Sequence, residues 1–176
     1  SSFQVCSLST TTGFATADTN LWPSGSIGVL ILCSLVCGCS GSTSGGMKMD
    51  RFVIVIKSFR GMVNSLIEAN VFNRTKLDGQ VKTDENVTSI ITFMGIYVLI
   101  IVIGTVIFAI SMDFKTSLTA SIACMGSVGP GFGDVGSLGN YAGLMGFQKV
   151  AAMLIMLLGR VEIYPMLIAF RCVFRR

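Results

Sequence analysis

A run of 23 residues without a charged side chain, Ile90–Met112, places the strongest constraint on this chain. At about 1.5 Å of helical rise per residue, roughly 20 apolar residues cross a hydrocarbon core ~30 Å thick. Lipid offers no partner to backbone N–H and C=O groups, so a spanning segment pairs them internally as a helix. The run therefore predicts an all-α integral membrane protein in which Ile90–Met112 is one complete span.

The composition agrees with a membrane location. Only 12% of the residues are charged, whereas soluble domains carry about 25%. The chain lacks His, so we interpret its six cysteines as small buried residues rather than zinc ligands. We find neither paired catalytic carboxylates nor a Ser–His or Cys–His set, and we expect no enzyme activity. No Met or basic segment opens the chain, and we expect it to be part of a longer protein.

Two further apolar segments are expected to cross the membrane, and one of them is interrupted. Val150–Phe170 is 21 residues long, which is enough to span by itself. Ser26–Cys37 is too short, but it joins Phe52–Val63 through the glycine-rich stretch CGCSGSTSGGMK, so that the two form half-helices of one span. A polar loop, Asn64–Asn86, leads to the next span.

Basic residues gather on one side of these spans. One group lies after the glycine-rich stretch, within the polar loop or after the last span: Lys48, Arg51, Lys57, Arg60, Arg74, Lys76, Lys82, Arg171, Arg175 and Arg176. Only Lys115 and Lys149 lie on the opposite side of the predicted spans. Because cytoplasmic loops carry the excess of Lys and Arg, we expect the polar loop and the C-terminus in the cytoplasm. A lipid-headgroup or nucleic-acid site is the weaker interpretation, since acids and apolar residues alternate with these bases.

Two amphipathic regions, Ser1–Asp18 and Lys115–Asp134, resemble each other. Each is too short to cross the membrane, bears Ser or Thr, and ends in a glycine turn: STTTGFATAD in the first and MGSVGPGFGD in the second. The aligned pairs are Gly13 with Gly129, Thr12 with Val128, Thr11 with Ser127 and Asp18 with Asp134. We therefore predict a repeated unit of outward helix, re-entrant half-helix, glycine turn and inward helix, complete over Ile90–Phe170.

The repeat offers a path for a cation. A re-entrant helix directs the partial negative charge of its C-terminal end toward the membrane midplane, and an extended turn after it can line up carbonyl oxygens that replace a cation's water shell. Gly allows the backbone angles that such a turn needs. A ring of the potassium-channel kind takes about four such turns, so a second chain or an upstream part must supply the rest. Alternatively, the two turns only cap surface helices, which leaves the repeat unexplained.

The glycine-rich stretch is interpreted as a gate. Its glycines allow irregular backbone, and they are Gly38, Gly41, Gly45 and Gly46. Its hydroxyl residues can hydrogen-bond the backbone N–H and C=O groups that such a break leaves unpaired, and they are Ser40, Ser42, Thr43 and Ser44. Irregular backbone survives at membrane depth only inside protein or beside a water-filled cavity, so we expect the stretch to lie across the pore and to move. A P-loop is the alternative, but it needs Gly-Lys-Ser/Thr in direct sequence, and here Met49 follows Lys48.

Arg160 is expected to act with the gate. It follows Gly129 by 31 residues, as Ser44 follows Gly13, so the repeat places it near the depth of the glycine-rich stretch. A midplane Arg costs at least ~2.5–3.5 kcal/mol on insertion scales and should face the interior. Its charge would repel a resident cation, and its donors could hold carbonyls of the stretch. The alternatives are an ion pair with Glu162, which a spacing of two on a helix does not favour, and snorkelling.

Four motifs together resemble the TrkH/TrkG/KtrB superfamily of potassium transporters over nearly the whole chain. STTTGFATAD resembles the third pore loop of that family, GCSGSTSGGMK the glycine-rich loop of its third inner helix, SVGPGFGDVG its fourth pore loop, and LLGRVEIYPMLIAF its Arg-bearing fourth inner helix. Ser44 departs from the family, whose members often carry Ala or Gly there. The resemblance implies a third pore repeat without its first helix over residues 1–64, a cytoplasmic loop over 65–86 and a fourth pore repeat over 87–176.

The resemblance also implies the site residues and the partners. The filter would comprise Thr11, Thr12, Gly13, Phe14, Ser127, Val128, Gly129 and Pro130, with potassium bound at Thr12, Gly13, Val128 and Gly129. The gate would comprise Gly38, Gly41, Ser42, Thr43, Gly45, Gly46 and Arg160. The implied partners are the lipid membrane, a second copy in a homodimer and a cytosolic nucleotide-binding regulatory ring of the TrkA/KtrA type. We expect no nucleic acid partner and no covalently bound cofactor.

We therefore predict potassium uptake across the cytoplasmic (inner) membrane through a gated pore with a selectivity filter. The alternative is a secondary transporter of another cation or a small solute. That fold places its breaks inside long spanning helices of both halves, whereas the glycine turns here follow short re-entrant helices. A third interpretation is a membrane scaffold that packs through small residues such as Gly38 and Gly41.

Overall fold

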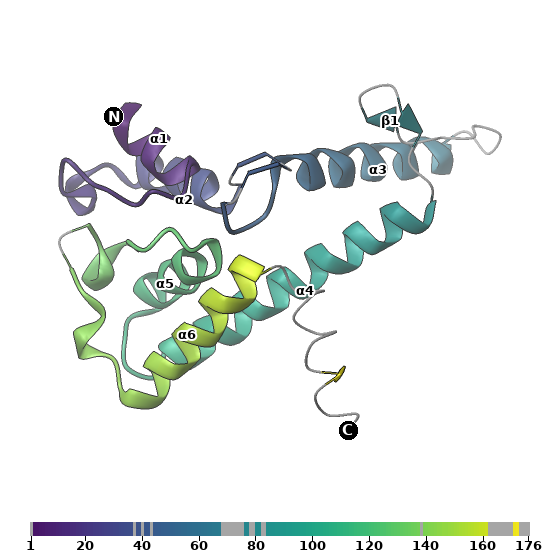
Figure 1. Cartoon of the computed structure of the whole chain (residues 1–176). Helices are drawn as coiled ribbons and strands as arrows, with labels where there is room; N and C mark the ends of the chain where they lie inside the picture. Colours follow the sequence, from purple (N-terminus) through teal and green to yellow (C-terminus); the bar gives the residue numbers. More distant parts are fainter. Residues whose placement is uncertain are drawn as a thin grey trace.

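The structure is a computed structural model that describes residues 2–36, 38–39, 41–42, 44–67, 76–77, 80–81, 84–137, 139–161 and 171–172. Almost all regular structure in this part of the chain is helical (Figure 1). The α-helices are α1 Ser2–Ser9, α2 Ser24–Leu35, α3 Met49–Ile67, α4 Asp84–Phe108, α5 Phe114–Gly126 and α6 Gly146–Val161. Short 3₁₀ turns are η1 Thr19–Leu21, η2 Gly133–Val135 and η3 Tyr141–Gly143, and strands β1 Lys76–Leu77 and β2 Gln80–Val81 pair antiparallel.

Helix α4 is, among the described residues, the one helix long and apolar enough to cross a membrane, over Val87–Phe108. It ends four residues before the predicted limit at Met112. The reason is a tight turn, in which the N–H groups of Ser111 and Met112 donate to Phe108 O at 3.1 and 3.2 Å and lead into α5. The charge-free run therefore contains both the end of a helix and a turn, which hydropathy does not separate.

The interrupted segment consists of two helices, α2 and α3, as the glycine-rich stretch between them predicts. Both helices extend a few residues beyond their expected outer limits, because Ser24 and Ile67 also adopt helical backbone. The last predicted span, Val150–Phe170, begins within α6, which is described to Val161. Residues 162–170 of that span lie outside the described residues.

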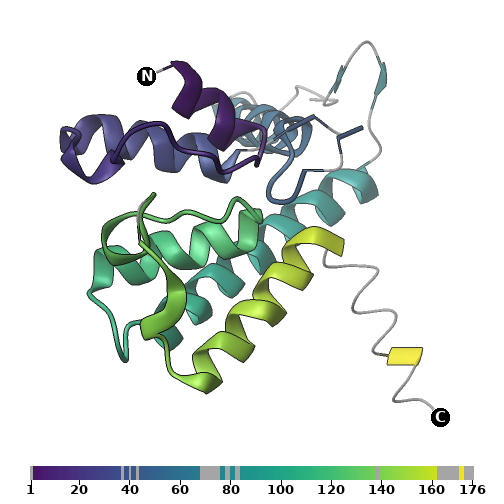
Figure 2. The ribbon, with the colours of Figure 1, turned by 60° about the vertical axis from the view of Figure 1, so that its left-hand side comes forward.

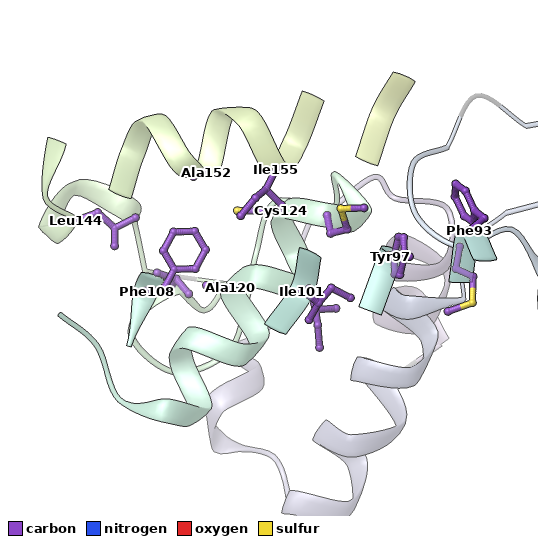
Figure 3. Packing of buried hydrophobic residues seen from close by; sticks show 13 residues of the cluster. Phe93, Tyr97, Ile101, Phe108, Ala120, Cys124, Leu144, Ala152 and Ile155 are labelled. Atoms are coloured by element: carbon purple, nitrogen blue, oxygen red, sulfur yellow. The ribbon is translucent and has the colours of Figure 1, made fainter. Parts of the chain in front are cut away.

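Helix α5 packs against both α4 and α6, which also contact each other (Figure 1). Small residues make this packing close: Ser121 is fully buried and its hydroxyl donates to Ile101 O of α4 at 2.9 Å. A Cβ on Gly104 of α4 would overlap Ser121 Oγ, so the two helices meet where neither has a large side chain. Figure 3 shows the surrounding core, to which α4 contributes Phe108, α5 contributes Cys124 and α6 contributes Ile155.

The outer faces of α4 and α6 carry many exposed apolar side chains. On α4 they include Val98, Leu99, Val102, Ile103 and Val106, and on α6 they include Met153, Leu154 and Leu157. Helices that are apolar on their exposed face fit a lipid environment, where no polar surface is needed for solvation. The arrangement therefore agrees with the membrane location that the composition predicts.

Candidate functional site

The two short helices α1 and α5 end in the same turn, followed by the same glycine conformation. Thr11 and Ser127 both adopt left-handed backbone, with φ of 57° and 53°. Two residues later Gly13 and Gly129 again have positive φ, 76° and 102°. The closing hydrogen bonds also correspond: Thr11 N to Leu8 O at 3.2 Å with Ser127 N to Cys124 O at 3.1 Å, and Thr12 N to Ser7 O at 2.9 Å with Val128 N to Ala123 O at 3.0 Å.

These matching bonds belong to a helix C-cap in which a left-handed residue redirects the chain and satisfies the last carbonyls of the helix. Left-handed backbone is costly for residues with a Cβ, by about 1–2 kcal/mol each. Two such residues at aligned positions therefore show that the repeat read from the sequence is also a repeat of backbone geometry. We call residues 11–14 the first turn and residues 127–130 the second turn.

The two turns contact each other at Gly13. A Cβ built on Gly13 would overlap the carbonyl oxygen of Val128 and lie 3.0 Å from Cδ of Pro130. Glycine is thus required here by contact as well as by its φ angle. At Gly129 a Cβ would meet nothing within 4 Å, so only the positive φ requires glycine there. The carbonyl of Val128 consequently lies at the junction of the two repeats.

Polar side chains of the short helices hold the chain that follows each turn. Ser7 Oγ donates to Phe14 O at 2.7 Å, and Gln4 Nε2 donates to Ala17 O at 3.1 Å. In the second repeat the hydroxyl of Thr119 lies 3.2 Å from both Phe132 N and Phe132 O. Sequence analysis did not single out these three side chains. The available signal was a set of Ser, Thr and Gln residues within short apolar helices, where buried polar groups need partners.

A pair of reciprocal hydrogen bonds joins the two repeats beyond the turns. Asn20 Nδ2 donates to Gly133 O at 3.1 Å, and Asn20 Oδ1 accepts from Gly133 N at 2.9 Å. Ser137 Oγ adds a second link, since it donates to Ala17 O at 3.3 Å and accepts from Thr19 N at 3.3 Å. These hydrogen bonds of Asn20 and Ser137 hold the segments after the two turns at a fixed separation. No sequence pattern predicted them.

The aligned aspartates do not have one common contact. Asp18 caps η1, where its Oδ1 accepts from Asn20 N at 3.0 Å. Asp134 lies within η2 and lines a cavity of about 490 Å³ between α2 and α5, together with Asp113 and Lys115. Their sequence alignment therefore does not extend to an equivalent cap.

The glycine-rich stretch lies against the ends of both short helices. Gly38 N donates to Ser9 O at the end of α1 at 3.3 Å. Gly45 approaches the end of α5 so closely that a Cβ would lie 2.8 Å from Gly126 O. Figure 2 shows the stretch in dark blue near the ends of these two helices. The stretch therefore contacts the C-terminal ends of α1 and α5, just before the two turns.

Within the stretch, the glycines serve different purposes. Gly38 and Gly46 have positive φ, 54° and 81°. Gly45 permits close approach, whereas Gly41 is exposed and a Cβ there would meet nothing within 4 Å. Ser42 Oγ accepts from the N–H of Ser44 at 3.2 Å, which is the backbone pairing that this hydroxyl was expected to provide, whereas the buried Ser44 Oγ has no hydrogen-bond partner among the described residues. Thr43, also expected in the gate, lies outside the described residues.

Helix α6 also contacts the C-terminal end of α5. Its Gly159 packs on the end of α5, where a Cβ would overlap the carbonyl oxygen of Met125. Gly159 and Gly45 therefore contact the consecutive carbonyls of Met125 and Gly126. The next residue, Arg160, has an exposed side chain, so the prediction that it faces the interior is not met within this chain. Glu162, its alternative partner in the sequence, lies outside the described residues.

The fold is that of a helical membrane protein with two repeated units, each a short helix that ends in a glycine turn. A sequence model of one family, described as a cation transport protein, matches residues 1–174. The chain therefore belongs to the TrkH family.

Relatives of known name agree with the family. The chain is 34% identical to the Trk system potassium uptake protein TrkG of Escherichia coli K12 and 32% identical to TrkI of Halomonas elongata, in each case over 99% of this chain. The crystal structure of the potassium transporter TrkH from Vibrio parahaemolyticus superposes with a TM-score of 0.87 at 30% identity, over 99% of this chain and 37% of that one. The chain spans 36% of the length of TrkG and TrkI.

Proposed function

We propose that this chain forms half of the pore of a potassium uptake protein, and that its first and second turns supply half of the selectivity filter. The observation that carries the proposal is the common backbone of two turns in contact, with left-handed Thr11 and Ser127 and positive φ at Gly13 and Gly129. The relatives named potassium uptake proteins support the choice of ion.

The cation would be bound by backbone carbonyl oxygens of Thr12, Gly13, Val128 and Gly129. Carbonyl oxygens can replace the hydration shell of potassium when a rigid loop holds them in a ring. The C-terminal ends of α1 and α5 come just before these residues, and each contributes a partial negative charge of about half an elementary charge. The two further turns that complete such a ring would come from another part of the full-length protein.

The glycine-rich stretch would act as the gate, with Gly38, Gly41, Ser42, Thr43, Gly45, Gly46 and Arg160 as its residues. The contacts of Gly38 with α1 and of Gly45 with α5 support this role, because they bring the stretch to the inner ends of both turns. Arg160 directly follows Gly159, whose backbone packs against the carbonyl of Met125 at the end of α5. The guanidinium would repel a cation in the pore and donate to carbonyls of the closed stretch.

The charge pattern and the family support a membrane orientation and a set of partners for the pore. The protein would lie in the cytoplasmic membrane with residues 64–86 and the C-terminus in the cytoplasm, as the excess of Lys and Arg indicates. The full-length protein would form a homodimer and bind a cytosolic nucleotide-binding ring that regulates the gate. Residues 1–64 and 87–176 would be two consecutive pore repeats.

Rubidium uptake into proteoliposomes that contain the full-length protein tests the proposal. We expect uptake down a rubidium gradient, strong competition by potassium and weak competition by sodium. Uptake that requires a proton or sodium gradient would instead indicate a secondary transporter. Empty liposomes provide the baseline, and a folded protein that gives no uptake above this baseline would refute the pore.

A further inference from the structure

The second turn has an anchor outside its own helix. Tyr141 of η3 donates its phenol O–H to the carbonyl oxygen of Gly129 at 2.9 Å. Gly129 is one of the residues proposed to bind potassium, and its carbonyl keeps a second lone pair when it accepts one hydrogen bond. The phenol therefore holds one filter residue from the side, twelve residues further along the chain.

Tyr141 is itself held in place. The carbonyl of its neighbour Ala142 accepts from Lys149 Nζ at 3.0 Å, and Asn140 Oδ1 caps η3 by accepting from Ala142 N at 3.1 Å. Burial raises the pKa of Tyr141, so the phenol keeps its proton at neutral pH and remains a donor. Cys124 of α5 lines the same cavity as the phenol. The anchor thus connects the second turn to η3 and, through Lys149, to α6.

A cavity beside the second turn explains why the hydrogen bond from Tyr141 is needed. A cavity of about 380 Å³ lies there, lined by Cys124, Gly129, Tyr141, Leu144, Lys149, Ala152, Met153 and Met156. A turn that borders empty volume has fewer packing contacts to oppose its displacement. The hydrogen bond from Tyr141 to the Gly129 carbonyl therefore restrains the direction of that carbonyl, which packing beside a cavity does not.

The first turn is restrained in another way. Its Phe14 carbonyl is held by Ser7 of the preceding helix at 2.7 Å, and its Gly13 abuts the second turn. The residue of the first repeat that aligns with Tyr141 is Gly25, which has no side chain to donate. The two turns share a backbone geometry, but among the described residues only the second turn accepts a hydrogen bond from a phenol at its glycine.

We infer that Tyr141 is a positioning residue of the filter, which fixes the direction of the Gly129 carbonyl and thereby sets the discrimination of potassium over sodium. The inference rests on the proposed function, because discrimination has meaning only in a conducting pore. Carbonyls that turn freely can contract around the smaller sodium ion. A carbonyl fixed by a phenol keeps the spacing that suits potassium.

The test is Tyr141→Phe in the full-length protein, which removes the donor and keeps the ring. Tyr97→Phe is the matched control, since Tyr97 is a buried phenol on α4 beside Phe93, outside the turns (Figure 3). We expect Tyr141→Phe to reduce the ratio of rubidium to sodium permeability about 2- to 10-fold, the range that corresponds to one hydrogen bond. The control should keep the ratio of the unaltered protein.

Amide hydrogen exchange tests the Tyr141 anchor independently of ion conduction. Amides of residues 127–133 should exchange faster in Tyr141→Phe than in Tyr97→Phe, whether or not the protein conducts. Unchanged exchange would overturn the anchor, and faster exchange with an unchanged permeability ratio would overturn the positioning role. If Tyr141→Phe fails to fold, Lys149→Met serves instead, because it removes the donor that holds η3; it should change both measurements in the same direction.

Discussion

A single methyl group at Gly45 tests whether the glycine-rich stretch is a barrier. Gly45 lacks the positive φ angle of Gly38 and Gly46, so alanine fits its backbone. The added methyl is therefore the whole perturbation. Gly41→Ala is the matched control: Gly41 belongs to the same proposed gate, but a Cβ there meets nothing within 4 Å, so this change alters the stretch without touching α5.

The structure sets the size of the effect. The methyl at Gly45 would lie 2.8 Å from Gly126 O and 3.2 Å from Cβ and Oγ of Ser127, whereas ordinary van der Waals contact lies at 3.4–4 Å. The nearest atom belongs to a backbone carbonyl, which does not rotate aside as a side chain would. Overpacking of this kind costs about 1–3 kcal/mol. This energy corresponds to a roughly 5- to 150-fold shift between two arrangements.

The shift should favour conduction, because the cost applies only while the stretch touches α5. We expect Gly45→Ala to raise rubidium flux in proteoliposomes at least about 5-fold, and Gly41→Ala to leave it unchanged. Flux is normalised to folded protein measured by size-exclusion chromatography. If folded Gly45→Ala conducts no more than Gly41→Ala, the contact with Gly126 does not hold a gate closed.

Three further changes test the filter, the gate and the topology. Gly13→Ala should lower potassium selectivity more than Gly129→Ala, because both strain the backbone but only the first overlaps Val128; equal permeability ratios would contradict this. Arg160→Ala and a shortened glycine-rich stretch should each raise rubidium flux, and their combination should be less than additive, with a coupling of roughly 0.5–3 kcal/mol; additive effects would mean that the two act separately. Cysteines introduced at Ser24 and Gly79 should react with impermeant reagents from opposite sides of the membrane, and labelling from one side would refute the topology.

Local sequence signals predicted the helical membrane fold and the repeat well. A charge-free run is long enough for a span whatever surrounds it, and α4 confirms that Ile90–Phe108 is helical. The glycine alignment also corresponds to a local property, since Gly13 and Gly129 have positive φ and their helices close with matching hydrogen bonds. Backbone angles of this kind depend mainly on the residue itself and its near neighbours, which a sequence displays directly.

Local signals were less exact where a run of one composition contains two structures. Residues 109–112 are as free of charge as the helix before them, yet they form the turn that leads into α5. Hydropathy reports the environment of a segment, whereas the turn is decided by how α5 packs back on α4. The predicted limit at Met112 was therefore wrong by four residues.

The residues that meet around the turns come from distant parts of the chain. Asn20 binds Gly133 across 113 residues, Tyr141 binds the carbonyl of Gly129, and Gly45 touches Gly126. None of these contacts has a local signature: Asn20 and Tyr141 lie in short 3₁₀ turns without a recognisable motif, and Gly45 is one of four glycines in its stretch. Length, charge and backbone freedom are properties of short segments, so they were enough to predict a membrane protein with two equivalent glycine turns. The partners of those turns depend on how distant helices pack, and that is a property of the folded chain alone.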